Sequence, residues 1–546
     1  MDRREFMKTA ALAGTAVLLN PWDVLLRRTM ASPKYFRLHP FVEAHPEAVF
    51  IKRTNVAVKT DSEAKRREGF NFAKEIFSLS DTSGIPLSRK IAIKPNLTCT
   101  GKVGNTVDGM GILTDKDFMD GMIEGMKDVG FPAERMYMRE GNWLGDAYCP
   151  TDYKYTGYTE VAERTGVHLL DFPTGRMIYQ LNLTILKEGD EVIWKDVPDG
   201  VVFKRIGYVA PFNDPDAWLL DVAKFKAHGM GLTLTVKNLQ GMCVHPLIHF
   251  CEGVDRTKKY PKDIFDAYFK ADLEEHVAEL HAKHLKEGVP RWDKPGRNWN
   301  SGYGMEMWAQ RTCDSLSVTN VGLAVVEGIY GRDGNGFMKG PGGKANDYMT
   351  NVIIFGKNPF KVDIIGHWLG GHEPGNFGLF HIAKERGLTD TFNPHEIPVY
   401  LWEEGVPKLV SLDELERFEL KTYYLQRNYN GQNEPLWHLV NEPYDYGPTS
   451  VEATEGGKPE AYVLGQNYPN PFNSSTIIEY RLPKDGYVTL EVFNSRGQRV
   501  DVLVRGWRRR GVHMAVWNAD GRASGVYIYR LRVDGFERTK RMVLVR

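Results

Sequence analysis

Cysteine is scarce in this sequence, and its spacing excludes two common uses of the residue. The chain of 546 residues has five cysteines and contains no C-x-x-C pair. A small, odd number of cysteines excludes a disulfide-rich scaffold, and the missing C-x-x-C pattern excludes a ferredoxin-type iron–sulfur segment. An iron–sulfur cofactor of that type is therefore not expected.

The sequence also lacks an excess of charge of either sign and any long hydrophobic run. Its 70 Lys and Arg residues balance 70 Asp and Glu residues, and 42% of all residues are hydrophobic. A dedicated nucleic-acid-binding protein usually shows a basic excess, so we expect no nucleic-acid partner. A transmembrane helix needs about 20 predominantly apolar residues, and no window reaches that length, so we expect no stable membrane span. The composition is that of a globular protein with about two to four domains.

The first 32 residues have the pattern of an export signal. The basic pair Arg3-Arg4 is followed by an apolar run of ten residues, Ala10–Leu19. Such a run is too short to cross a membrane and has the length of a signal-peptide core. The pair, with Phe6 behind it, resembles the twin-arginine signal, which implies passage through the twin-arginine export machinery as a folded protein.

The last 85 residues have the pattern of a separate β module. A segment rich in Pro, Gly, Ser, Thr and acidic residues precedes them, so we expect a linker over 411–461. Residues 462–546 carry 15 Lys and Arg against 7 Asp and Glu, a net charge of +8, and the rest of the neutral chain therefore carries −8. Short alternating runs between turn residues predict a small antiparallel β-sandwich. The expected strands are 476–480, 488–493, 512–517, 526–533 and 542–545.

This β module also resembles a known family. Its motifs are Gln466-Asn467-Tyr468-Pro469-Asn470-Pro471-Phe472-Asn473, Ser495-Arg496-Gly497-Gln498 and Ala523-Ser524-Gly525-Val526-Tyr527. They are similar to those of the C-terminal sorting domain of type IX secretion substrates. The resemblance implies an immunoglobulin-like sandwich, the type IX outer-membrane secretion machinery as a partner, and a path from the periplasm to the cell surface or the exterior. A carbohydrate-binding sandwich is the alternative, with Tyr468, Phe472, Tyr527 and Tyr529 as sugar-contacting aromatics instead of core or turn residues.

Residues 49–410 have the pattern of an α/β domain. Apolar runs of strand length alternate there with longer helical patterns, which predicts a layered α/β fold. Strands are expected at 91–93, 218–225, 321–326 and 352–355, and a helix at 115–129. In open α/β sheets, ligands bind beyond the carboxyl ends of the strands. Lys94 and Asn96 follow the first of these strands and are therefore candidate ligand-binding residues.

The second of these strands ends in a row of cations. Side chains alternate along a strand, so Lys224, Lys226 and His228 share one face. A helix is expected next, with Thr233 and Lys237 on one side. Backbone N–H groups at a helix start, together with Lys and His side chains, suit a phosphate or a carboxylate. The alternative is a solvated edge strand with surface lysines.

Several motifs of this region resemble a second family. They are Lys94-Pro95-Asn96, Lys224-Phe225-Lys226-Ala227-His228-Gly229 with Thr233, Lys237-Asn238-Leu239-Gln240-Gly241, Val325-Val326-Glu327-Gly328, Asp333-Gly334-Asn335-Gly336 and Asn358-Pro359-Phe360-Lys361-Val362-Asp363. They are similar to the signature of the domain of unknown function 362 over most of residues 49–400. The chain departs from it at Gln240, where an aromatic residue is usual, and at Glu327, where aspartate is usual. The family has no settled activity, so the resemblance implies a fold and site positions but no reaction.

Acidic and histidine residues of the same domain add candidates for proton transfer. Asp363 and His367 lie at i,i+4 in a predicted helix, so they share a face and could form an acid–base pair. An ordinary contact on a helix surface is the alternative. His276, His281 and His284 lie in a highly charged predicted helix, and we interpret them as part of its solvated surface.

A short segment with two cysteines and two histidines is a candidate metal site. Cys243, His245, His249 and Cys251 lie within nine residues. Thiolate and imidazole suit zinc, copper or iron, so a divalent metal is a candidate cofactor. Two alternatives remain: a disulfide between Cys243 and Cys251 in an oxidising compartment, or no special role for the segment.

Together these patterns favour an exported enzyme that acts on a small anionic substrate. The candidate ligand-binding residues are Lys94, Asn96, Lys224, Lys226, Thr233, Lys237, Asn238 and Asp333. The candidate catalytic residues are His228, as the acid–base group, with Asp221, Glu327 and Asp363, which would hold a cation or position the substrate. The alternatives are a noncatalytic ligand-binding protein of the cell surface that uses the same site, and a metal or redox protein centred on residues 243–251.

Overall fold

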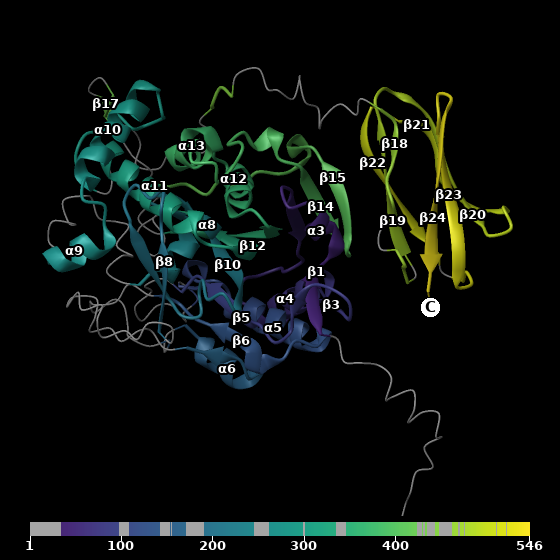
Figure 1. Ribbon diagram of the computed structural model, residues 1–546, viewed down its shortest axis with the longest axis horizontal. Coiled ribbons are helices and arrows are strands. Elements are labelled where there is room, and N and C mark those ends of the chain that lie inside the picture. Colours follow the sequence, from purple (N-terminus) through teal and green to yellow (C-terminus); the bar gives the residue numbers. More distant parts are fainter. Residues whose placement is uncertain are drawn as a thin grey trace, which may run out of the picture.

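The structure is a computed structural model that describes two parts of the chain, an α/β domain and a C-terminal β module (Figure 1). The described residues are 34–97, 107, 109–141, 153, 156–170, 191–244, 261–298, 301–334, 345–422, 428–429, 432–433, 443–446, 461–467, 470–473, 475–508, 510–519 and 521–545. The expected export signal, residues 1–32, lies outside them. Among the described residues, no helix combines the length and the apolar character that a membrane span needs.

A ten-stranded mixed sheet forms the centre of the α/β domain. Its strand order is β15-β14-β2-β13-β12-β10-β5-β6-β7, with β11 paired to β10. Its strands are β2 (Val49–Arg53), β5 (Lys90–Pro95), β6 (Met136–Met138), β7 (His168–Leu169), β10 (Ala217–His228), β11 (Gly231–Thr233), β12 (Val321–Arg332), β13 (Asp347–Gly356), β14 (Val399–Glu403) and β15 (Val406–Val410). Strand β10 runs parallel to both of its long neighbours, β5 and β12. The predicted α/β class is confirmed.

Helices cover both faces of this sheet (Figure 1). One face carries α4 (Ser62–Ile76), α5 (Lys116–Val129) and α6 (Tyr158–Thr165), and the other carries α8 (Thr235–Leu239), α11 (Gly302–Ser317), α12 (Pro359–Leu369) and α13 (Gly378–Glu385). Alternation along β10 explains the two layers, because Leu220 and Val222 pack into the first core and Leu219, Ala223 and Phe225 pack into the second. A strand buried on both faces is rich in apolar residues on both, as this one is from Ala217 to Leu220, and its charged residues stand out toward its end.

Helix α5 begins and ends where the sequence predicts. Asp115 caps its start, because the side chain accepts hydrogen bonds from the N–H groups of Asp117 and Phe118. Gly130 ends it with a φ of 116°, a left-handed conformation that favours glycine. The cap fixes the carboxylate of Asp115 at the carboxyl edge of the sheet.

Smaller elements surround this framework. A three-stranded sheet contains β1 (Tyr35–Leu38), β3 (Phe77–Ser80) and β4 (Ile85–Pro86), and two further strand pairs are β8 (Val192–Asp196) with β9 (Arg205–Val209) and β16 (Asn428–Tyr429) with β17 (Gln432–Asn433). The remaining helices are α3 (Pro40–Ala44), α9 (Lys262–Tyr268) and α10 (Leu273–Lys286). Leu415 and Leu420 belong to the core of the α/β domain, so the packed chain extends past the boundary expected at residue 410.

The C-terminal module consists of two antiparallel sheets around a core of its own. Its strands are β18 (Val463–Leu464), β19 (Ser475–Leu482), β20 (Gly486–Asn494), β21 (Arg499–Arg508), β22 (Gly511–Asn518), β23 (Gly525–Val533) and β24 (Phe536–Leu544). The sequence did not predict β21, because Val504 is its one buried residue and the alternation is weak. Phe472, Tyr527 and Tyr529 are buried, which contradicts their alternative role as exposed sugar contacts, and Tyr468 lies outside the described residues.

Candidate functional site

The candidate residues lie where three parallel strands end side by side. The register places Lys94 of β5 beside Asp221 of β10, and Lys224 of β10 beside Glu327 of β12. Residues that are more than a hundred positions apart in sequence therefore meet at the carboxyl edge of the sheet, which is the edge where α/β proteins bind their ligands.

Lys94 and Lys226 converge at this edge, but from opposite faces of the sheet. Lys226 shares its face with Leu220 and Val222, whereas Lys94 faces α8 and donates to Asn238 Oδ1 at 3.1 Å. Asn96 joins them: its Oδ1 accepts from Lys226 Nζ at 2.9 Å, and its Nδ2 donates to Asn238 Oδ1 at 3.0 Å. The two lysines are thus connected through two amides and do not both point at one ligand.

Lys94 is a buried, neutralised cation. Its Nζ lies 2.8 Å from Glu140 Oε2, and the lysine side chain is fully buried. Gly241 allows this pair to pack against the end of α8, because a Cβ at that position would lie 2.4 Å from Glu140 Oε1 and 2.9 Å from Lys94 Cε. Because Glu140 neutralises its charge, Lys94 stabilises the carboxyl edge of the sheet and is not available to bind an anion.

Lys224 is neutralised in the same way. Its Nζ lies 2.8 Å from Glu327 Oε2 and 3.4 Å from the centroid of the Tyr330 ring, and Lys224 and Glu327 are both fully buried. Glu327 also accepts from the N–H of Asp115 at 3.0 Å, and Asp115 pairs with Lys65 at 2.7 Å. The solvated edge strand that we held as an alternative is wrong, because these lysines lie inside the domain.

Lys226 is the exception among the three lysines of this edge. The side chain is 1% exposed, and its Nζ donates to Asn96 Oδ1 at 2.9 Å and to the carbonyl oxygen of Ile112 at 2.5 Å, both of them neutral acceptors. In the described part of the chain it forms no ion pair. Burial lowers the pKa of Lys226 well below its usual value, and the nearby Lys237 and Arg332 lower this pKa further.

Two more buried polar atoms at this edge have no hydrogen-bond partner among the described residues. Thr233 pairs with Lys226 in the antiparallel register of β10 and β11, and its hydroxyl is unsatisfied although the residue is 4% exposed. Asp221 is fully buried and accepts from Asn238 Nδ2 at 2.6 Å, but its Oδ2 is unsatisfied. Buried polar groups are rarely left without partners, so these two atoms mark places where a ligand or a proton is needed.

His228 lies two residues beyond Lys226 on the same face of β10 and adds a further hydrogen-bonding group to the site. Its Nδ1 accepts from the N–H of Met230 at 3.2 Å, which leaves the proton on Nε2. Burial and the nearby Lys237 and Lys226 hold the pKa of His228 well below its usual range. The ring is therefore neutral and suited to donate a hydrogen bond, so the geometry does not favour the acid–base role that we expected for it.

The start of helix α8 is not an anion site, which corrects the sequence expectation. Thr233 lies in β11, and α8 begins only at Thr235. The carboxylate of Asp363 occupies the helix start, because it accepts from the N–H groups of Thr235 at 2.7 Å and Val236 at 3.0 Å. Thr233 and Lys237 therefore do not lie on one side of a common helix.

Asp363 and His367 do not form the expected acid–base pair. His367 Nδ1 meets the backbone oxygen of Asp363 at 2.8 Å, while the Asp363 carboxylate points to α8. Burial raises the pKa of Asp363 to about 7 and lowers the pKa of His367 to about 3. Asp333 accepts from the N–H of Asn346 at 2.7 Å and from the Tyr348 hydroxyl. The candidate acidic residues thus have separate protein partners and do not form one cation site.

Of the candidate metal ligands, only Cys243 lies in the described part of the chain. It is a free, buried thiol, which contradicts the disulfide alternative. Burial raises the pKa of Cys243 to about 12, and its Sγ lies 3.5 Å from Ser315 Oγ. A thiol that keeps its proton is a poor metal ligand. His245, His249 and Cys251 lie outside the described residues.

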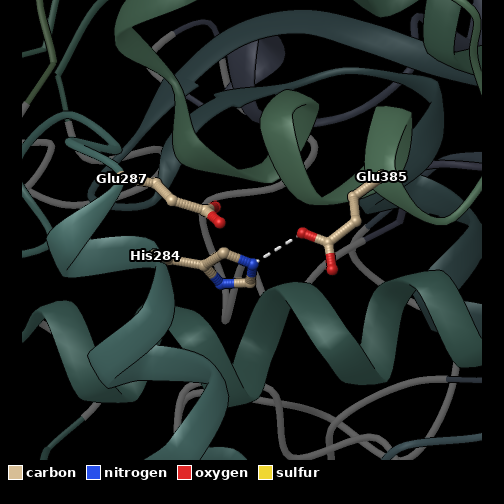
Figure 2. Close-up of side chains that lie close together, drawn as sticks. All are labelled: His284, Glu287 and Glu385. Carbon is tan, nitrogen blue, oxygen red and sulfur yellow. Dashed lines mark hydrogen bonds and ion pairs between the residues drawn. The ribbon is translucent and has the colours of Figure 1, made fainter.

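His284 is buried and forms ion pairs with buried Glu306 and with the more exposed Glu385, which corrects its interpretation as part of a solvated helix. Figure 2 shows its ring close to Glu287 and Glu385, and one ligand atom from each of the three lies within 4.8 Å of the other two. However, Nδ1 lies 2.7 Å from Glu306 Oε2 and Nε2 lies 2.8 Å from Glu385 Oε2. Both ring nitrogens are thus engaged by carboxylates, which favours the protonated ring over a metal ligand.

Sequence reasoning missed several partners at the carboxyl edge of the sheet. They are Lys65, Asp115, Glu140, Tyr330 and Arg332. Two of them, Glu140 two residues after β6 and Arg332 at the end of β12, could have been found with the same rule that singled out Lys94, since both stand near a strand end. The other three depend on contacts between distant elements and leave no local signal.

A comparison with family models finds one match. The model described as a domain of unknown function (DUF362) matches residues 91–367, which contain β5, β10, β12 and the residues of the carboxyl edge. No curated protein matches the chain.

Solved structures give only weak similarities. One is the dimeric latent PorU from Porphyromonas gingivalis, with 22% identity and a TM-score of 0.13, covering 15% of this chain and 9% of that chain. Another is PorZ, described as an essential bacterial surface component of the type-IX secretion system of the same organism, with 19% identity and a TM-score of 0.12, covering 17% of this chain and 13% of that chain. This chain therefore spans only a small part of either protein.

Proposed function

This chain belongs to the DUF362 family, and we propose that its α/β domain binds a small anionic substrate at the carboxyl edge of the sheet, as an enzyme. The residues that would contact the anion are Lys226, Thr233, His228 and Lys237. Lys94, Asn96, Lys224, Asn238 and Glu327 would hold them in place. This set is narrower than the sequence suggested, because Lys94 and Lys224 are already neutralised by carboxylates.

The hydrogen bonding of Lys226 carries the proposal. An ammonium group has three protons, and the described structure offers Lys226 only two acceptors, both neutral. A buried cation without a counter-charge is strongly unfavourable. An oxyanion beside Lys226 would accept the third proton, and it could also accept from the unsatisfied Thr233 hydroxyl and from Nε2 of His228. One ligand group would thus accept hydrogen bonds from three side chains and supply the counter-charge that Lys226 lacks.

Asp221 is the group we assign to positioning the Lys226 site. Burial raises the pKa of Asp221 well above its usual value. Its carboxyl lies on the opposite face of β10 from Lys226 and is connected to it through the amides of Asn238 and Asn96. Asp221 would therefore act through these amides and would not touch a ligand at Lys226. The proposal contains no metal step, because neither Cys243 nor His284 offers a free lone pair or thiolate.

Inorganic phosphate is a suitable probe for the anion site. A ligand that binds only the folded state raises the melting temperature, so phosphate should stabilise the natural chain against heat. Lys226→Met should abolish that increase, whereas Lys408→Gln, an exposed lysine of β15, should leave it unchanged. An equal phosphate effect in the natural chain and in Lys226→Met would refute the site.

Catalysis is separable from binding. Incubation of the natural chain with a mixture of small phosphorylated and carboxylated compounds, followed by mass spectrometry, should show one compound consumed, and Lys226→Met should not consume it. Compounds that bind but stay unchanged would favour the noncatalytic ligand-binding alternative.

For the cell-level function, we infer export by a twin-arginine signal at residues 1–32 and delivery to the surface by a sorting domain at 462–546. The motifs of both segments support this, and so does the separate core of the C-terminal module. An immunoglobulin-like arrangement of that module is part of the same proposal. Exchange of Arg3 and Arg4 for lysine should leave the precursor in the cytoplasm, because the guanidinium pair and not bare charge is recognised. Normal export of that variant would refute the signal.

A further inference from the structure

A cavity lies at the opposite edge of the sheet, where the parallel strands begin. Its volume is about 700 Å³, and its wall includes Ala217 and Leu219 of β10 and Val321 and Gly322 of β12. Arg37 of β1 also reaches it. Cavities of roughly 300–1,000 Å³ are typical of small-molecule sites.

This cavity is separate from the Lys226 site. Leu219 lines the cavity and Lys226 stands seven residues further along the same extended strand. At about 3.3 Å per residue, the two positions are roughly 23 Å apart along β10. A ligand here would not be the substrate of the other edge.

The two carboxylates of the cavity wall each have a lysine partner. Glu43 pairs with Lys357 at 2.7 Å, and Asp214 pairs with Lys90 at 2.7 Å. Asp214 also interacts with the charge of Lys195, so the carboxylates of the wall are shared among more cations than they can balance.

Three cations of the wall have no such balance. Arg37, Arg89 and Lys195 all line the cavity, and in the described part of the chain none of them forms an ion pair. Arg89 donates to the carbonyl oxygen of Pro215 at 2.6 Å, which leaves its charge uncompensated. The Nε of Arg37 is shielded from solvent and has no hydrogen-bond partner. The cavity thus presents positive charge and at least one unsatisfied donor.

The floor of the cavity is apolar. Trp218, Leu219 and Val321 contribute to it, and Trp218 is 7% exposed. The indole of Trp218 packs directly against Gly322. A Cβ at position 322 would lie 2.1 Å from Trp218 Nε1, so a larger residue there would displace the ring. A ligand for this site needs an apolar body for the floor and a negative group for the cationic rim.

We propose that this cavity is a second ligand site, which binds a small organic anion with an apolar body. Arg37, Lys195 and Arg89 hold its anionic group, and the surface formed by Trp218 and Val321 holds its body. The inference concerns binding and does not depend on the function proposed for the Lys226 site.

A pair of matched dyes tests this site. The probe is 8-anilinonaphthalene-1-sulfonate, an aromatic anion, and its control is N-phenyl-1-naphthylamine, which lacks the sulfonate. Fluorescence titration of the full chain should show tighter binding of the anionic dye. A hydrogen bond to a charged group contributes about 1.5–3 kcal/mol, so Arg37→Gln and Lys195→Gln should each weaken the anionic dye about tenfold or more. Neither variant should weaken the neutral dye.

The controls make the result unambiguous. Lys408→Gln should bind the anionic dye as the natural chain does, since this exposed residue does not line the cavity. Arg37 and Lys195 stand on different strands, so a folding defect in one variant leaves the other informative. Unchanged affinity for the anionic dye in both well-folded variants, or equal weakening of both dyes, would overturn the inference.

Discussion

Lys226 and Thr233 face each other across the tight turn between β10 and β11, and both are buried. The ammonium of Lys226 has two neutral acceptors, and the Thr233 hydroxyl has no partner in the described structure. Burying polar groups without full hydrogen bonding is unfavourable, and packing does not compensate for it. Proteins keep such groups mainly at functional sites.

The first prediction compares two lysines on one face of the same strand. Lys224→Met should destabilise the domain by about 3–5 kcal/mol, because it leaves the buried Glu327 carboxylate unpaired. Lys226→Met should change the free energy of unfolding by less than about 1 kcal/mol, or raise it, because it removes a buried charge that has no partner. Urea unfolding of both variants measures the difference. Similar losses in both would mean that Lys226 is a structural residue.

The positions of this site were predictable because the signals are local. Alternation along β10 placed Lys224 and Lys226 on one face, and the strand-end rule singled out Lys94 and Asn96. The roles were not predictable, because they depend on which lysine meets a carboxylate. Glu327 and Glu140 reach their lysines from neighbouring strands, and no local pattern reports such a pairing.

The sequence also misplaced the start of α8 and the role of Asp363, because both depend on contacts between distant segments. Gly231 adopts a φ of 88°, and a Cβ there would lie 2.8 Å from the Phe377 ring, so the chain turns back at once and pairs with β10. The local pattern of residues 233–240 favoured a helix, but the tertiary turn overrides its first two positions. Asp363 likewise caps a helix 128 residues away in the chain, a role that its i,i+4 spacing to His367 does not reveal.

The second prediction concerns the pH dependence of the His284 cluster. Burial lowers the pKa of His284, but the hydrogen bonds and charges of Glu306 and Glu385 raise it above its usual value. The stabilisation is therefore fully present below the unfolded pKa of about 6.5 and is lost as the pH rises through the higher folded value. His284→Gln should remove this part of the pH dependence.

Unfolding free energies in urea at about pH 6 and pH 9 measure this effect, and His276→Gln on the same helix is the control. His276 forms no ion pair among the described residues, so its replacement should leave the pH dependence intact. If His284→Gln and the natural chain lose the same stability between the two pH values, the ion pairs do not contribute.

The third prediction uses the buried carboxyl of Asp221. Burial raises the pKa of Asp221 well above its usual value, so the folded state holds a proton that the unfolded state releases near pH 3.9. Stability from this group is present below that pH and decreases as the pH rises toward the folded pKa. Asp221→Asn has no such proton, and its stability should decrease less between about pH 4 and pH 7.

Asp363→Asn is the matched control for Asp221→Asn. Asp363 is also a buried carboxyl with a raised pKa, but its oxygens accept hydrogen bonds at the start of α8, so the amide should cost stability at every pH. Urea unfolding across the pH range separates the two. A curve for Asp221→Asn that runs parallel to that of the natural chain would mean that Asp221 is ionised in the folded state.

The last prediction concerns the independence of the C-terminal module. Its core contains no residue of the α/β domain, and one ion pair, His45 with Glu479 at 3.8 Å, links the two parts in the described structure. Both side chains are partly exposed, and such pairs contribute about 1 kcal/mol or less. Deletion of residues 462–546 should therefore change the free energy of unfolding of the α/β domain by no more than His45→Ala does in the full chain. Urea unfolding followed by circular dichroism measures both, and a truncated chain that no longer unfolds cooperatively would show that the two parts share a core after all.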